Sequence, residues 1–188
     1  MRYLYALIGL LVMLAATAAA VTSTVIVDED NYVDADNANQ SFSDSDTLLA
    51  ASADEKPIKE VYLSIRNNFN TTNVFSSEDI KSATLDLTVT QAENPGEMKI
   101  YFVHGAAIGI TWLNKPEYDS SVSVAFNAEG KGSQTLDVTP LIKKAAETCA
   151  DGCPFSFVIV AGDNASVGFA SSEGSEKDKP SLKYQTTG

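Results

Sequence analysis

Few side chains in this 188-residue chain could catalyse a reaction. His104 is the single histidine, which excludes any mechanism that needs two imidazoles. Nucleophilic catalysis by Ser or Cys needs a base beside the nucleophile, and His104 follows an apolar stretch where a structural role is expected. The 25 Asp and Glu residues offer many carboxylate pairs for glycoside hydrolysis, but no pair stands out. We therefore predict that the protein is not an enzyme.

The two cysteines, Cys149 and Cys153, are separated by three residues. This spacing is not the C-x-x-C of redox enzymes, and two cysteines with one histidine cannot supply a Cys/His metal cluster. In an oxidising compartment the pair is expected to form a disulfide. Such a bond would tie the end of a helix to the strand that follows.

Sugar recognition needs flat aromatic faces and planar polar groups on a wet surface. Residues 60–65 alternate in type, and by parity Tyr62, Ser64 and Arg66 share the face opposite the apolar residues. We expect this stripe to face solvent and to bind a glycan, with an ordinary solvated sheet as the alternative. Trp112, the single tryptophan, is interpreted as a packing anchor. Further glycan-binding candidates are Tyr32, Tyr118 and Asn67.

Charge limits the possible partners. The chain has 13 Lys and Arg and 25 Asp and Glu, which gives a net charge of -12. That excess of acids excludes a nucleic-acid binder, which needs clustered cations. It favours neutral glycans, or acidic glycans bridged by a cation. The acids Asp28, Asp30, Asp34 and Asp36 could supply oxygen ligands to Ca²⁺, although their spacing is not that of an EF-hand. No cofactor is required, and plain acidic loops are the alternative to a calcium site.

Residues 1–20 have the composition of a secretory signal peptide, with Arg2 before an apolar run and small residues at the end. A membrane anchor is the alternative, but the apolar run is short for a span. Residues 21–188 then form a single domain that is secreted or displayed at the cell surface, with no span left after cleavage. Three N-glycosylation sequons lie in predicted loops, at Asn39, Asn70 and Asn164.

The elements that would position these residues are mostly strands. Residues 82–90 alternate strictly between apolar and polar types, which predicts a strand with one buried face. The turn signal at residues 93–96 predicts a hairpin with residues 98–103. Thr139 is placed to cap one short helix, with Pro140 in its first turn and Gly152 beyond its end. Many short strands and one short helix predict an all-β sandwich.

Several motifs, in order, resemble those of the DNRLRE domain, the group that includes carbohydrate-binding module family 96. Residues 80–87 (IKSATLDL) are similar to its I-x-S-A-T-L-x-L segment. The other matching segments are residues 24–27 (TVIV), 30–33 (DNYV), 46–49 (DTLL), 61–65 (VYLSI), 111–116 (TWLNKP), 136–141 (LDVTPL), 168–173 (GFASSE) and 179–182 (KPSL). The resemblance implies a β-jelly-roll, secreted or on a cell surface, that binds polysaccharide. The chain has Ser64 and Lys179 where the family usually has a basic residue and Arg, which puts a contact to an acidic glycan in doubt.

Two functions follow from these observations. The first is a secreted, non-catalytic carbohydrate-binding or adhesive domain at the cell surface. The alternative is a structural subunit of an extracellular filament or matrix. In that case residues 22–27, which are rich in β-branched side chains, would be donated to the open sheet edge of the next subunit. Both place the protein outside the cell, with a glycan or a second copy of itself as the partner.

Overall fold

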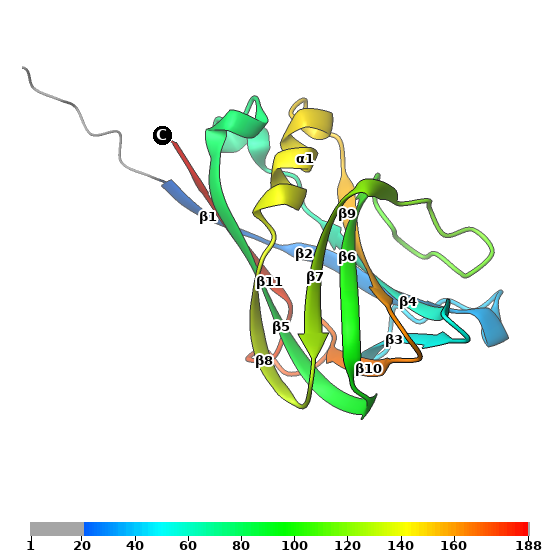
Figure 1. Cartoon of the computed structure of the whole chain (residues 1–188). Coiled ribbons are helices and arrows are strands. Elements are labelled where there is room, and N and C mark those ends of the chain that lie inside the picture. The colour runs from blue at the N-terminus through cyan, green and yellow to red at the C-terminus, as the bar shows by residue number, and fades with distance from the viewer. Residues whose placement is uncertain (1–20, 188) are drawn as a thin grey trace, which may run out of the picture.

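The computed structural model describes residues 21–187 (Figure 1). The predicted signal peptide, residues 1–20, lies outside this range. In the part of the chain that the structure describes, no helix could span a lipid bilayer.

The fold is all-β, with antiparallel strands throughout and one α-helix in the described part of the chain. The sheet follows the order β1-β11-β5-β10-β3-β4-β9-β6-β7, with β2 paired to β4 and β8 paired to β5. The strands are β1 Val21–Val25, β2 Val27–Asp34, β3 Thr47–Ala53, β4 Lys56–Ile65, β5 Ile80–Asn94, β6 Gly96–His104, β7 Asp119–Ala128, β8 Gly132–Asp137, β9 Phe155–Ala161, β10 Ser166–Ala170 and β11 Ser181–Thr186. The helix is α1, Thr139–Cys149, and short 3-10 turns lie at Ala35–Asn37, Phe69–Thr71 and Ser77–Asp79.

Strand β5 joins the two layers of the sandwich. Its first half pairs with β11 and β8 and its second half with β10, with shifts in register along the way. The alternation in its sequence is confirmed, because Ala83, Leu85, Leu87 and Val89 are buried while the residues between them are partly exposed. The long strand curls the sheet so that β5, β8 and β11 face β6, β7 and β9 across the core (Figure 1). The predicted jelly-roll β-sandwich is confirmed.

The predicted hairpin between β5 and β6 is wrong. Although only Pro95 separates the two strands, four other strands lie between them in the order of the sheet. Both bury apolar side chains in the same core cluster, including Leu87 and Ile100. The turn therefore carries the chain across the core to the opposite layer instead of folding it back onto its neighbour.

Helix α1 packs against β5, β6 and β7. It buries an apolar face of Leu141, Ile142, Ala145, Ala146 and Cys149. The predicted cap at Thr139 is wrong, because Val138 is the N-cap and gives no side-chain hydrogen bond to the helix. Thr139 instead accepts a hydrogen bond from the backbone N–H of Ala83 through its Oγ1, at 2.8 Å. This threonine therefore ties the helix to β5.

The predicted first strand is two strands, interrupted at the exposed Ile26. Strand β1 pairs with β11 and β2 pairs with β4, so this stretch links two parts of the sheet. Both ends of the described chain thus lie in one sheet (Figure 1). Strand β1 ends the strand order, and its outer edge has no partner within residues 21–187. Self-association through this strand stays a prediction.

A second apolar cluster lies on the far side of the sheet from the main core. It contains Val33, Tyr62, Val103, Val158 and Val160 from neighbouring strands. The segment between β6 and β7, residues 105–118, adds two buried residues, Ala107 and Ile110. This segment therefore covers a sheet face that a simple sandwich would leave to solvent.

Candidate functional site

A cavity of about 300 Å³ opens between strand β4 and the end of segment 105–118. We call it the Trp112 cavity. Its lining is formed by Pro57, Glu60, Tyr62, Trp112, Lys115, Pro116, Glu117 and Tyr118. Three aromatic side chains, two carboxylates and one ammonium thus meet in one small space. Aromatic faces with a few fixed polar groups are the usual composition of a ligand site.

Hydrogen bonds from the sheet hold segment 105–118 in place. The Nδ2 of Asn31, on β2, donates to the carbonyl of Ile110 at 2.9 Å, and both residues are buried. The backbone N–H of Ala107 donates to Oγ of Ser64, on β4, also at 2.9 Å. Because buried polar groups must be satisfied, these bonds fix the segment on the sheet and set the position of Trp112.

A buried carboxylate is the polar centre of the cavity. Oε1 of Glu60 lies 2.6 Å from Nζ of Lys115, and the Glu60 side chain is only 3% exposed. The hydroxyl of Tyr62 donates to Oε2 of Glu60 at 3.0 Å. Both oxygens are therefore occupied, as a charge in such a position requires. Burial, and then the adjacent Glu60, raises the pKa of Tyr62 far above its ordinary value, so its hydroxyl stays protonated as a donor.

Aromatic rings form the walls of the cavity. Nζ of Lys115 lies 3.7 Å from the centroid of the Trp112 ring, close enough for a cation–π interaction. The ring of Tyr118 stacks on Tyr101 with centroids 4.5 Å apart and 25° between the planes. Burial, followed by the charge of Glu60, raises the pKa of Tyr118. Each of these contacts occupies one face of its ring, so a flat ligand would have to stack on the other face.

The sequence profile of carbohydrate-binding module family 96 matches residues 21–186. The chain belongs to this family. The match covers the whole described fold apart from one residue at its end, and it confirms the resemblance drawn from the motifs. No curated protein sequence matches the chain.

The predicted stripe of Tyr62, Ser64 and Arg66 does not form an exposed surface in this family 96 module. Tyr62 and Ser64 do lie opposite the main core, but they are 1% and 2% exposed, so their expected solvent exposure is wrong. Parity gave the correct face, but segment 105–118 covers that face. Arg66 is exposed just beyond β4, forms an ion pair with Asp28, and is not part of the cavity lining.

The other aromatic candidates differ in their position. Tyr118 lines the cavity, where its role in binding stays a prediction. Tyr32 is buried and stacks on Phe42 with centroids 4.3 Å apart, so it offers no open face. Trp112 is partly buried against the second cluster, as a packing anchor would be, yet it also lines the cavity.

Sequence reasoning did not select Glu60 or Lys115 as site residues. Glu60 follows polar residues at the start of a strand, and its type alone suggests a solvated position. Lys115 lies in the 111–116 motif, and its residue type alone predicts an ordinary exposed cation. The only available signal was that motif, because the partners are 55 positions apart in the sequence and only the fold joins them.

The four aspartates predicted to bind Ca²⁺ do not share one site. Asp28 pairs with Arg66, and Asp36 is exposed. Asp34 accepts a hydrogen bond from Lys59 at 2.6 Å; burial opposes its ionisation, but this bond holds its pKa below the ordinary value.

Asp30 is the most deeply buried of the four. Its carboxylate accepts hydrogen bonds from Oγ of Ser171 at 2.8 Å and from the backbone N–H of Ser172 at 2.6 Å. Burial raises the pKa of Asp30. The acids therefore do not converge in the part of the chain that the structure describes, and calcium binding stays an untested prediction.

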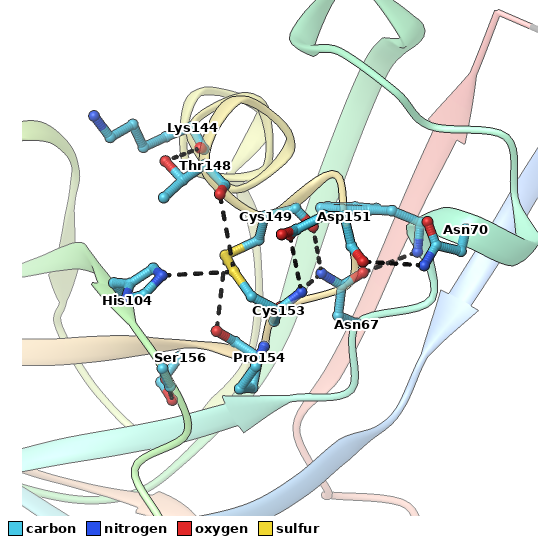
Figure 2. The surroundings of a disulfide bond; sticks show 12 residues. Asn67, Asn70, His104, Lys144, Thr148, Cys149, Asp151, Cys153, Pro154 and Ser156 are labelled. Atoms are coloured by element: carbon cyan, nitrogen blue, oxygen red, sulfur yellow. Dashed lines mark hydrogen bonds between the residues drawn. A yellow bond between two sulfur atoms is a disulfide. The ribbon is translucent and has the colours of Figure 1, made fainter.

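The disulfide between Cys149 and Cys153 is confirmed. Figure 2 shows it between the end of α1 and the start of β9, with His104 on one side and Asn67 on the other. The sequon residues Asn39, Asn70 and Asn164 are all exposed, and Nδ2 of Asn70 donates to the carbonyl of Asp151 near the disulfide. Their glycosylation stays a prediction.

Proposed function

We propose that this module binds neutral sugar units of a glycan in the Trp112 cavity, outside the cell and without catalysis. The observation that carries this proposal is the cavity itself, in which Trp112 and Tyr118 lie beside the ion pair of the buried Glu60 and the partly exposed Lys115. The C–H faces of a sugar ring can stack on such aromatic rings, while its hydroxyls bond to carboxylate and phenol groups. Family membership supports the carbohydrate as ligand.

The charges of the lining support a neutral ligand. Lys115 is the single cation among the lining residues, and Glu60 already neutralises it at 2.6 Å. Glu117 then leaves the lining with an excess negative charge, in a chain whose net charge is -12. A uronate carboxylate would meet repulsion there, whereas a neutral ring would not. The cavity lining is thus net negative, as the whole chain is.

Binding without catalysis fits the position of the imidazole. His104 lies at the end of β6 beside the disulfide, and it does not line the cavity. Modules of this kind are typically non-catalytic, and that general property supports the proposal. Export is supported by the Cys149–Cys153 bond, because disulfides persist in oxidising compartments.

The test is binding of the purified protein to a panel of neutral and uronate oligosaccharides, followed by calorimetry. We expect binding to neutral members, and an affinity loss of about tenfold or more for Trp112→Ala, since stacking contributes on the order of 1.4 kcal/mol. Phe75→Ala is the matched control, because Phe75 is 69% exposed and lies outside the cavity. The proposal fails if no glycan binds, or if Trp112→Ala binds as well as the unchanged protein.

A second candidate is assembly through strand β1. The supporting observation is that β1 lies at the end of the strand order, with Val21 at its start 50% exposed. An open edge of this kind can pair with another copy of the chain. Light scattering on the purified protein should then show oligomers that disappear when residues 21–25 are deleted. A monomer at all concentrations would leave only the glycan-binding function.

A further inference from the structure

The end of α1 brings together three side chains that the cavity does not use. Nε2 of His104 lies 3.6 Å from Sγ of Cys153, as Figure 2 shows. A ring nitrogen of His104 and the sulfurs of Cys149 and Cys153 all lie within 4.8 Å of one another. The histidine comes from the end of β6, 45 positions before the first cysteine, so only the fold places it there.

We infer that this group is a redox-gated Zn²⁺ site, closed while the disulfide is intact and open once it is reduced. Thiolate and imidazole are the preferred zinc ligands, and a zinc ion with three protein ligands keeps its fourth position for water. The spacing of Cys149 and Cys153 falls in the range seen for cysteine pairs at zinc. The sequence excludes a Cys/His cluster with four protein ligands, because two cysteines and one histidine are too few. A site with three protein ligands and one water needs no fourth side chain.

The chemistry needs a reductant of the thiol class. A dithiol gives two electrons and two protons to the Cys149–Cys153 bond, which becomes two thiols while the reductant becomes its own disulfide. Zn²⁺ then displaces the two thiol protons and binds both thiolates and Nε2 of His104. In the reverse step a disulfide oxidant accepts two electrons from the two thiolates and, with two protons, becomes a dithiol. The thiolates rejoin as the Cys149–Cys153 bond and the ion is released.

The loop that carries the cysteines is held by bonds that reduction leaves intact. The Nδ2 of Asn67 donates to the carbonyls of Cys149 and Cys153, at 2.9 and 2.7 Å. The backbone N–H of Gly152 donates to the carbonyl of Cys149 at 3.0 Å. The loop that the disulfide closes is short, so opening it adds little conformational freedom to the unfolded chain. We therefore expect the fold and the position of the two sulfurs to survive reduction.

His104 is held on the other side by its neighbour. The backbone N–H of Gly105 donates to the carbonyl of Pro154 at 3.0 Å, which fixes the end of β6 beside the residue that follows Cys153. His104 is exposed and Cys153 is partly exposed, whereas Cys149 is buried. An ion can thus reach the two outer ligands from solvent and find the third beneath them.

The test uses the purified protein, reduced with a dithiol, freed of it without oxygen, and titrated with Co²⁺. We expect a cobalt–thiolate absorption band that saturates at one ion per chain and is bleached by Zn²⁺. The oxidised protein should give no such band. Reoxidation of the same sample should abolish the band and release the ion, and this measurement needs no variant. No band after reduction, or binding without thiolate absorption, would overturn the inference.

Two variants separate the ligands. Mutating a residue that only hydrogen-bonds to a metal ligand typically lowers metal affinity about 10–100-fold. Because His104 is itself a ligand in this site, His104→Ala should lower the affinity by more than that. The Cys149→Ser/Cys153→Ser variant should bind no ion under either condition, with its fold checked by circular dichroism. If His104→Ala binds the ion as tightly as the unchanged protein, two thiolates alone account for binding and the three-ligand site is refuted.

Discussion

Segment 105–118 begins beside the disulfide and ends at the Trp112 cavity, and these two regions are stabilised in different ways. At the cavity, Lys115 and Glu60 face each other across 2.6 Å with the carboxylate almost fully buried. At the disulfide, a covalent bond and hydrogen bonds from Asn67 hold a short surface loop. Breaking a buried ion pair leaves an uncompensated charge, whereas opening a short covalent loop mainly frees the unfolded chain. The non-covalent region should therefore be the more sensitive of the two.

The largest effect is expected for Lys115→Met. This change leaves the Glu60 carboxylate buried without its cation, and we expect the free energy of unfolding to fall by about 3–5 kcal/mol. Urea denaturation measures it. Lys177→Met is the matched control, because the Lys177 side chain is 82% exposed. This change should alter the free energy of unfolding by no more than about 0.5 kcal/mol.

The double variant Lys115→Met/Glu60→Gln sharpens the same test. Removing both charges should recover part of the lost stability, because no buried ion is then left without a partner. A loss below about 1 kcal/mol for Lys115→Met alone would show that water reaches the carboxylate, and the contrast between the two regions would disappear.

A smaller effect is expected for Cys149→Ser/Cys153→Ser. The loop it opens is short, so the free energy of unfolding should fall by about 2 kcal/mol, while glycan binding at the cavity stays unchanged. Denaturation and calorimetry on the same sample measure both quantities. A loss as large as that of Lys115→Met, or a loss of glycan affinity, would show that the two ends of the segment are coupled.

The smallest change is Tyr62→Phe, which removes one hydrogen bond to a charged group and should cost about 1.5 kcal/mol at neutral pH. The pKa of Tyr62 is raised above its ordinary 10.0, so above pH 10 the unfolded phenol loses its proton while the folded one keeps it. The folded state then binds more protons, and stability falls as pH rises. In Tyr62→Phe this contribution is absent, so its free energy of unfolding should fall less between neutral pH and about pH 10.5. The difference should be just under about 1 kcal/mol. Identical alkaline profiles would contradict the burial of this hydroxyl.

Local pattern was sufficient for much of the fold. The alternation along β5 predicted its buried face, because successive side chains of a strand point to opposite sides. The separation of the two cysteines suited a disulfide, and the ordered motifs indicated the family. Each of these depends on residues that are close in the chain or on a pattern that repeats along it.

The tertiary structure alone decided the site. Parity placed Tyr62 on the face away from the main core, but it could not show that residues 105–118 cover that face. Glu60 and Lys115 meet across 55 positions of sequence, and His104 and Cys153 across 49. Period-2 alternation records only which side of a strand a residue faces. What lies against that side is set by how distant segments pack, and the sequence does not state this locally.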